Sequence, residues 1–293
     1  MERPQGIVDF TPSAEFFPFE SRWFESSVGP VHYIDEGSGR AILLMHGNPD
    51  WSFLYRKMVL ALRDEYRCVA VDYPGFGLSV HPDGYGYTAA EHATVVGELV
   101  RDLDLQDCIV MGQDWGGPIG MAVASDAPER VHGLVMGNTW YWPESHWMTA
   151  TFSRVMGSLP IQWLIKRRNF FVSPLMKQMV RAKLSEEELS HYQNVVPTPD
   201  SRVGIAEFPK QILAARPWLA TIEKRVRETL TEKPLLLVWG MRDPAFGRGP
   251  FLKKWQANFP EATLVRLKDA GHYIQEDAPD EIVRAIREKF NTT

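Results

Sequence analysis

Residues 109–118 read Ile109-Val110-Met111-Gly112-Gln113-Asp114-Trp115-Gly116-Gly117-Pro118, a hydrophobic strand that runs into a glycine-flanked turn. The pattern G-x-nucleophile-x-G predicts a nucleophile elbow, a sharp turn between a strand and a helix that exposes one reactive side chain. The central residue is Asp114, where many such elbows carry Ser. A carboxylate with an ordinary pKa near ~4 is already an anion at neutral pH. Asp114 can therefore attack saturated carbon directly and form an ester with the protein.

Short apolar runs of strand length recur along the rest of the chain, with helix-like segments between them. The runs cover residues 31–37, 41–45, 67–72, 107–111, 131–136, 235–239 and 262–267. One helix-like segment opens with Thr88-Ala89-Ala90-Glu91, a capping box that predicts a helix to about Leu103. Others are expected at 116–127 and 280–290. Strands and helices in alternation predict an α/β fold with a mostly parallel sheet and helices on both faces.

The pattern changes between residues 140 and 218, where no strand-like run occurs. Helix-like segments are expected at 147–156, 160–170, 175–184 and 186–194. We interpret this region as a helical cap inserted after the strand that follows the nucleophile helix. The predicted organisation is a main domain of residues 1–139 and 219–293 and a cap of residues 140–218. Its candidate cavity-lining residues are Trp140, Trp147, Phe152, Phe170, Phe171, Leu175 and Met176.

Composition limits the classes of partner. The chain has 293 residues, of which 44% are hydrophobic, and a net charge of −5. Its longest basic cluster, Lys166-Arg167-Arg168, is interpreted as a solvated helix end, so nucleic acid is not an expected partner. Cys68 and Cys108 make no metal-site pattern. The sequence has neither an apolar run of ~18 residues nor a signal-peptide pattern, which predicts a cytoplasmic protein without a membrane partner.

Reactive groups are expected at the carboxyl ends of the strands, where parallel α/β sheets gather them. His272 follows the last strand-like run and is the candidate general base for the water that hydrolyses an ester on Asp114. Asp243 follows the 235–239 run and is the candidate acid that orients the imidazole. Asp269 is closer to His272 in sequence, but it precedes the turn and ranks second.

A tetrahedral intermediate needs N–H donors beside the nucleophile. The backbone N–H groups of Asn48 and Trp115 are the expected oxyanion hole. His46 is interpreted as a structural residue below the oxyanion loop. No metal ligand is expected.

In order, these motifs resemble the haloalkane dehalogenases of the α/β-hydrolase superfamily, over almost the whole chain. The resemblance rests on His46-Gly47-Asn48-Pro49, Trp51-Ser52-Phe53-Leu54-Tyr55-Arg56, Asp72-Tyr73-Pro74-Gly75-Phe76-Gly77, Gly112-Gln113-Asp114-Trp115-Gly116, Trp239-Gly240-Met241-Arg242-Asp243 and Gly271-His272-Tyr273-Ile274-Gln275-Glu276. It implies that Asp114 displaces a halide from a small apolar halogenated substrate. The indole of Trp115 and the side-chain amide of Asn48 would hold the halide, and water activated by His272 would release an alcohol. The resemblance implies no cofactor.

The family has branches that differ in the acid and in the second halide donor. Residues 136–139 contain no carboxylate, so Asp243 takes the role of the acid, and Asn48 fills the place of the second donor. This combination resembles a branch that tends to self-associate, which implies a possible homo-oligomer.

Two other functions are alternatives. An epoxide hydrolase would need acidic phenols in the cap, for which Tyr192 and Tyr141 are candidates. A binding protein for a small apolar ligand would have no need of Asp243 and His272 at the strand ends.

Overall fold

The structure is a computed structural model that describes residues 3–247 and 249–290. Its centre is an eight-stranded sheet in the order β1-β2-β4-β3-β5-β6-β7-β8. The strands are β1 (Arg22–Ser26), β2 (Gly29–Glu36), β3 (Ala41–Met45), β4 (Arg67–Val71), β5 (Cys108–Asp114), β6 (Val131–Thr139), β7 (Leu235–Gly240) and β8 (Thr263–Leu267). Strand β2 is antiparallel to both β1 and β4, and the strands from β4 to β8 pair in parallel. The predicted mostly parallel sheet is confirmed, and β1 is a strand that the sequence analysis missed.

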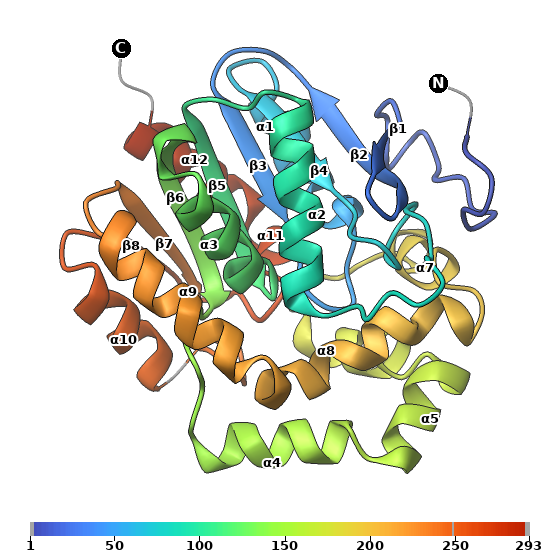
Figure 1. Cartoon of the computed structure of the whole chain (residues 1–293). Coiled ribbons are helices and arrows are strands. Elements are labelled where there is room, and N and C mark those ends of the chain that lie inside the picture. Colours follow the sequence, from blue (N-terminus) through green and yellow to red (C-terminus); the bar gives the residue numbers. More distant parts are fainter. Residues whose placement is uncertain (1–2, 248, 291–293) are drawn as a thin grey trace.

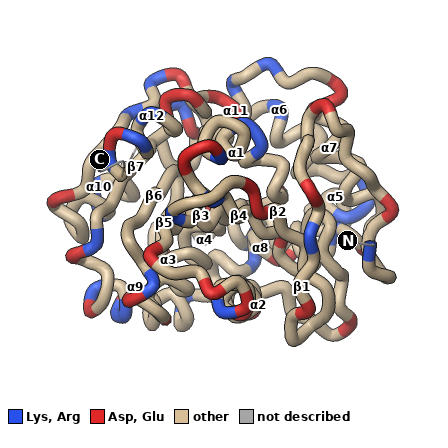
Figure 2. Tube along the Cα trace, turned by 90° about the horizontal axis from the view of Figure 1, so that it is seen from above, with Lys and Arg blue, Asp and Glu red and all other residues tan. Residues whose placement is uncertain are grey.

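Helices cover both faces of the sheet (Figure 1). One layer contains α2 (Ala89–Asp102), α3 (Gly116–Asp126) and α9 (Arg216–Thr229), and the other contains α1 (Arg56–Leu62), α11 (Ile274–Asp277) and α12 (Pro279–Phe290). Helix α10 (Pro250–Asn258) lies near the β8 edge. Thr88 and Glu91 form the predicted capping box at the start of α2. Acidic and basic side chains are interspersed along α9 and α12 (Figure 2).

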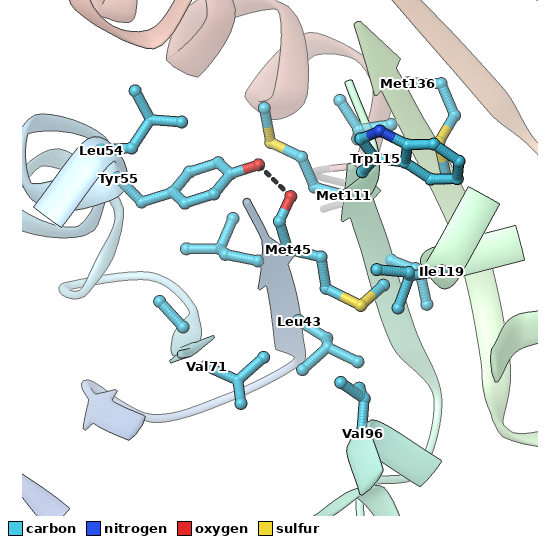
Figure 3. Packing of buried hydrophobic residues seen from close by; sticks show 14 of the residues in the cluster. Leu43, Met45, Leu54, Tyr55, Val71, Val96, Met111, Trp115, Ile119 and Met136 are labelled. Atoms are coloured by element: carbon cyan, nitrogen blue, oxygen red, sulfur yellow. Dashed lines mark hydrogen bonds between the residues drawn. The ribbon is translucent and has the colours of Figure 1, made fainter. Parts of the chain in front are cut away.

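The central strands are buried on both faces, and this fixes the positions of the loops that follow them. Every residue of β3 is buried. Figure 3 shows Met45, the last residue of β3, directed toward Ile119 of α3. The hydroxyl of Tyr55 donates to the Met45 carbonyl at 2.8 Å. This bond holds the short 3₁₀ helix at Ser52–Tyr55 against the end of β3, where the loop with Asn48 begins.

Between β6 and α9 the chain is helical, and Figure 1 shows these helices beside the carboxyl ends of the strands with α4 outermost. They are α4 (Trp147–Met156), α5 (Leu159–Arg168), α6 (Met176–Met179), α7 (Glu186–Asn194) and α8 (Val203–Ala214), with a π-helical turn at Phe171–Leu175 and a 3₁₀ turn at Asp200–Arg202. Another 3₁₀ turn, Pro128–Arg130, lies between α3 and β6. The helices predicted at 147–156 and 186–194 are confirmed. The one predicted at 175–184 is too long, because the backbone becomes extended at Val180. The cap boundaries at 140 and 218 stay a prediction.

Candidate active site

Asp114 lies at a strained turn between β5 and α3. Its φ is +51°, a left-handed conformation that side chains other than glycine rarely adopt. The flanking glycines allow this turn: a Cβ at Gly112 would meet the backbone of Gly116, and a Cβ at Gly116 would meet the Met45 carbonyl. The hydroxyl of Thr139 donates to the Asp114 carbonyl at 2.6 Å and supports the turn from β6. The predicted elbow geometry is therefore present.

Both predicted backbone donors point at the Asp114 carboxylate. The Asn48 N–H donates to Oδ1 at 2.9 Å, and the Trp115 N–H also bonds to the carboxylate. Gly47 permits this approach, because a Cβ there would lie 2.5 Å from Cβ of Asp114. Oδ1 is thus held by the Asn48 N–H, and Oδ2 faces His272.

His272 lies between two carboxylates. Its Nδ1 is 2.9 Å from Oδ2 of Asp243, and its Nε2 is 3.8 Å from Oδ2 of Asp114. The side-chain amide of Gln113 is 3.2 Å from Nε2. Asn138 donates to the same Asp243 oxygen at 2.7 Å. Asn138 was not predicted as a site residue, because its position in the sequence showed only that residues 136–139 lack a carboxylate; its amide holds Asp243 in place.

Charge and burial shift the pKa values of these three groups. Burial alone would lower the pKa of His272, but the carboxylates of Asp243 and Asp114 raise it to about 9. Burial tends to raise the pKa of Asp243, and the facing imidazole and the Asn138 amide bring it below its usual range. The pKa of Asp114 is raised by burial, which His272 and the two backbone N–H groups only partly oppose. The expectation of an ordinary carboxyl at Asp114 is therefore wrong, because the group is largely removed from water.

Two of the other sequence candidates lie away from the nucleophile. Asp269, ranked second as the acid, is exposed and pairs with Arg242. His46 is buried, with Nδ1 2.8 Å from the Gly47 carbonyl and its ring against Tyr73. Burial lowers the pKa of His46 to about 4, so its ring is neutral at physiological pH.

The candidate halide donors lie beside Asp114. Among the described residues, the indole N–H of Trp115 has no hydrogen-bond partner, whereas the Asn48 amide donates to the Ile205 carbonyl of α8 at 3.2 Å. Trp140 packs edge-on against Trp115, with ring centroids 4.8 Å apart, and its buried N–H is also unpartnered. Unpartnered N–H groups next to a nucleophile are available to an anion.

A second buried carboxyl, missed in the sequence, lies in the same loop as Asn48. Asp50 is buried, and neither of its oxygens has a partner among the described residues. Burial raises its pKa to about 8, while the charge of His272 opposes this shift and those of Asp114 and Glu276 add to it. A neutral carboxyl can donate one hydrogen bond and accept others, which suits a site for water. In the sequence, its only mark is an acidic side chain between Pro49 and Trp51.

A buried ionic network joins the main domain to the helical segment. Arg56 of α1 bonds to Glu276 of α11 and to Glu188 of α7, the latter at 2.6 Å. The hydroxyl of Tyr192, also on α7, donates to Glu276 at 2.5 Å. Lys57 adds a contact of 2.8 Å to Glu276. This network fixes α7 against the main domain.

The candidate lining residues divide into two groups. Trp140, Phe171 and Met176 are buried, and Phe170 and Leu175 are partly buried. Trp147 and Phe152 were wrongly expected to line a cavity, because they are exposed on the outer side of α4, opposite the face that packs on α8.

Among the described residues, no group of three or more His, Cys, Asp or Glu side chains could hold a metal ion. Nor is any helix within this part of the chain both long and apolar enough to cross a bilayer.

Comparison with known proteins places this site in a family. Residues 40–279 match the family model described as alpha/beta hydrolase fold. Haloalkane dehalogenase 2 of Mycobacterium tuberculosis is 54% identical over 283 residues, 97% of this chain and 99% of the relative. The cis-3-alkyl-4-alkyloxetan-2-one decarboxylase of Shewanella oneidensis is 31% identical, over 94% of this chain and 90% of the relative.

A solved structure agrees in fold. The haloalkane dehalogenase DatA of Agrobacterium tumefaciens superposes with a TM-score of 0.83 at 24% identity, covering 94% of this chain and 98% of that one. At this identity the likeness establishes the fold, and the family rests on the mycobacterial relative. The chain therefore belongs to the haloalkane dehalogenases, hydrolases of the α/β-hydrolase fold that act on carbon–halide bonds.

Proposed function

We propose that the protein hydrolyses halogenated alkanes to an alcohol, a halide and a proton through a covalent ester on Asp114. His272 is the general base, Asp243 orients it, and Asn48 and Trp115 bind the halide. Residues 140–218 form the cap over this site. The observation that carries the proposal is the 3.8 Å between Nε2 of His272 and the free oxygen of Asp114, too long for a hydrogen bond and suited to a base that must act on water.

In the first step, Oδ2 of Asp114 attacks the carbon in line, and the halide leaves with the bonding electron pair. Burial removes water from this carboxylate, which makes it a stronger nucleophile. The N–H of the Trp115 indole and the side-chain amide of Asn48 stabilise the growing negative charge on the halide.

In the second step, His272 takes a proton from water, which attacks Cγ of Asp114. Ester formation has by then removed one of the negative charges that raise the pKa of His272, so this pKa falls and the neutral imidazole becomes more abundant. The oxyanion develops on Oδ1, which already accepts from the Asn48 N–H, and the Trp115 N–H also bonds to this carboxylate. The Cγ–Oδ2 bond of the attacked intermediate then breaks, and the departing alkoxide takes the proton from the His272 imidazolium to become the alcohol. The new carboxyl of Asp114, which keeps the oxygen from water, loses its proton to solvent and is again a carboxylate. We assign Asp50 to hold water beside His272.

The epoxide hydrolase alternative loses support from the two phenols that it needs. The hydroxyl of Tyr192 is engaged by Glu276, and that of Tyr141 accepts from Asn258 of α10. Tyr192 therefore has no free proton for an epoxide oxygen. Tyr141 keeps its O–H proton, but its ring packs among Trp142, Trp255 and Phe259.

Purified protein is expected to release bromide from short bromoalkanes. Halide release, measured over a series of chain lengths with epoxides as comparison substrates, tests the proposal directly. Turnover of epoxides without any bromide release would overturn it.

A second candidate substrate is a β-lactone, because the decarboxylase from Shewanella oneidensis matches nearly the whole chain. Like an alkyl halide, a β-lactone has a saturated carbon bonded to a leaving anion, here a carboxylate. Attack by Asp114 at that carbon would open the ring, and loss of carbon dioxide with departure of Asp114 would give an alkene. Including a cis-dialkyl oxetanone in the same substrate series, with alkene detected by gas chromatography, tests this activity.

Replacing Asn48 by Ala should raise the activation free energy of carbon–halide cleavage by about 2–4 kcal/mol, because one donor to the leaving halide is lost. Rapid-mixing measurement of the first turnover isolates this step. Asn258→Ala is a matched control, because the Asn258 amide bonds to Tyr141 away from Asp114. An unchanged cleavage rate in Asn48→Ala would remove Asn48 from the role of halide donor.

A further inference from the structure

The exposed apolar side chains of the protein are concentrated on two helices. Of the seven large hydrophobic residues that are well exposed in the described chain, six lie on α4 and α5, and the seventh, Leu60, lies on α1. The six are Trp147, Met148, Phe152, Val155, Leu159 and Trp163, with exposed fractions between 46% and 87%. We call them the outer apolar face. A monomeric protein rarely exposes so many together without an interaction that uses them.

The helical repeat of α4 gathers its four exposed apolar residues, Trp147, Met148, Phe152 and Val155, on one side. Ala150, Ser153 and Met156 recur every third residue of α4 and are buried, so the residues between them point outward. The Ser153 hydroxyl donates to the Pro209 carbonyl, which fixes the buried side of α4 on α8. In Figure 1, α4 and α5 lie at the end of the molecule opposite the amino ends of the central strands, with nothing beyond them.

The charge around this face differs in sign from the charge of the whole chain. Residues 145–185 contain no Asp or Glu, although the full sequence has 37 acidic against 32 basic residues. On α4 and α5 the basic residues are Arg154, Lys166, Arg167 and Arg168. Lys177, Arg181 and Lys183 follow farther along the chain, where the Arg181 N–H binds Asp277 of α11. Among the described residues none of the seven forms an ion pair. Their charges are therefore available to an external anionic partner.

Basic and apolar groups also lie next to one another. Arg154 is exposed between Phe152 and Val155. One turn of helix separates Trp163 from Arg167, so both project from the same side of α5. The Arg168 guanidinium lies 5.9 Å from the centre of the Trp163 ring.

We propose that the outer apolar face, with its surrounding basic residues, docks the protein on the surface of a bilayer that contains anionic lipids. Trp, Leu and Phe side chains enter the interface between headgroups and acyl chains, while Arg and Lys bind lipid phosphates. The protein lies on the membrane without crossing it, in accord with the absence of a spanning helix among the described residues. The sequence predicted no membrane partner because it contains no apolar run long enough to cross a bilayer. A peripheral contact needs no such run, and here we propose one.

A second copy of the chain is a poorer occupant of this face. A symmetric dimer brings the same patch of both copies together. It would place two sets of unpaired cations against each other, and like charges across an interface oppose binding. An anionic bilayer satisfies the apolar and the basic residues at once. It also holds apolar alkanes, which partition out of water, at the side of the protein that carries the helical segment.

Co-sedimentation with vesicles of phosphatidylcholine, with and without phosphatidylglycerol, tests the proposal. We expect at least about tenfold tighter binding to the vesicles that contain phosphatidylglycerol, and weaker binding as salt is added. Trp147 and Trp163 should give a blue-shifted fluorescence when vesicles are added, because their indoles leave water.

Two variants separate the apolar from the basic contribution. Leu159→Ser with Trp163→Ser, and separately Arg167→Glu with Arg168→Glu, should each lower vesicle binding by about tenfold or more. Bromide release from a short bromoalkane in vesicle-free buffer should stay unchanged, since all four side chains are exposed and remote from Asp114. Matched controls on other surfaces, Leu60→Ser and Arg284→Glu, should bind vesicles like the unaltered protein.

Equal binding to both kinds of vesicle, or no binding, would overturn the proposal. So would a loss of binding in the control variants to the same degree. If the apolar variant instead converts an oligomer to a monomer in sedimentation velocity, and vesicle binding does not respond, the face is a contact between copies of the chain. None of these outcomes depends on which substrate the active site accepts.

Discussion

His272→Gln is expected to stop the reaction after its first chemical step and to leave the alkyl group attached to Asp114. The nucleophile needs no base, because its carboxylate attacks as an anion held by the N–H groups of Asn48 and Trp115. Water does need one, and loss of a general base costs about 10²–10⁴-fold in rate. Ester formation should therefore outpace its hydrolysis in the variant.

Intact-mass spectrometry after exposure to a bromoalkane measures this directly, and the mass should rise by one alkyl group in place of a proton. Peptide mapping should locate the group on Asp114. The double variant Asp114→Asn with His272→Gln is the control and should stay unmodified. If the folded single variant binds substrate and its mass does not change, the two-step mechanism is wrong.

Asp243→Asn is expected to slow ester hydrolysis by about 10⁴-fold, the scale seen when the acid of a Ser-His-Asp triad is replaced by its amide. Oδ2 of Asp243 now accepts from Nδ1 of His272 and from Asn138. An amide nitrogen in that place would face two donors and favour the wrong imidazole tautomer. The pKa of His272 should also fall, because the carboxylate that chiefly raises it is gone.

The fold should tolerate this change, since the Asn oxygen can still accept from the N–H groups of Ala245 and Phe246, as Oδ1 of Asp243 does. Asp269→Asn is the matched control: it removes an acid three residues before His272 that is exposed and paired with Arg242. Single-turnover measurement of ester decay should separate the two variants by orders of magnitude. If the ester of Asp243→Asn is hydrolysed at the normal rate, or if hydrolysis is lost in Asp269→Asn, then Asp243 is not the residue that orients His272.

The sheet and the turn at Asp114 were predictable because the sequence pattern of each segment agrees with the structure that it adopts. The run before Asp114 is apolar, and the glycines beside it leave room for a backbone that other residues would obstruct. Thr88 and Glu91 begin α2 as their spacing requires. In contrast, β1 reads Arg-Trp-Phe-Glu-Ser, a short edge strand without a clear apolar run, and its pairing with β2 decides its structure.

The side on which a residue lies was harder to predict. Trp147 and Phe152 were expected to line the cavity because they lie in the Trp- and Phe-rich segment interpreted as a cap with an apolar underside. Their orientation depends on how α4 packs on α8, a helix that the sequence analysis did not identify. Asn138 acts through its bond to Asp243, which is far away in the sequence, and Asp50 is buried only by the folding of the chain around it, so the neighbours of these residues in the sequence do not reveal the role of either.

The buried contacts of Glu276 limit how the site can open. Movement of the entire helical segment away from the main domain would separate Arg56 from Glu188 and Tyr192 from Glu276. A buried charge that loses its partner destabilises the structure by about 3–5 kcal/mol. A hinge at that junction would therefore open rarely. Substrate entry and product escape must therefore use smaller displacements that leave these contacts of Glu276 intact.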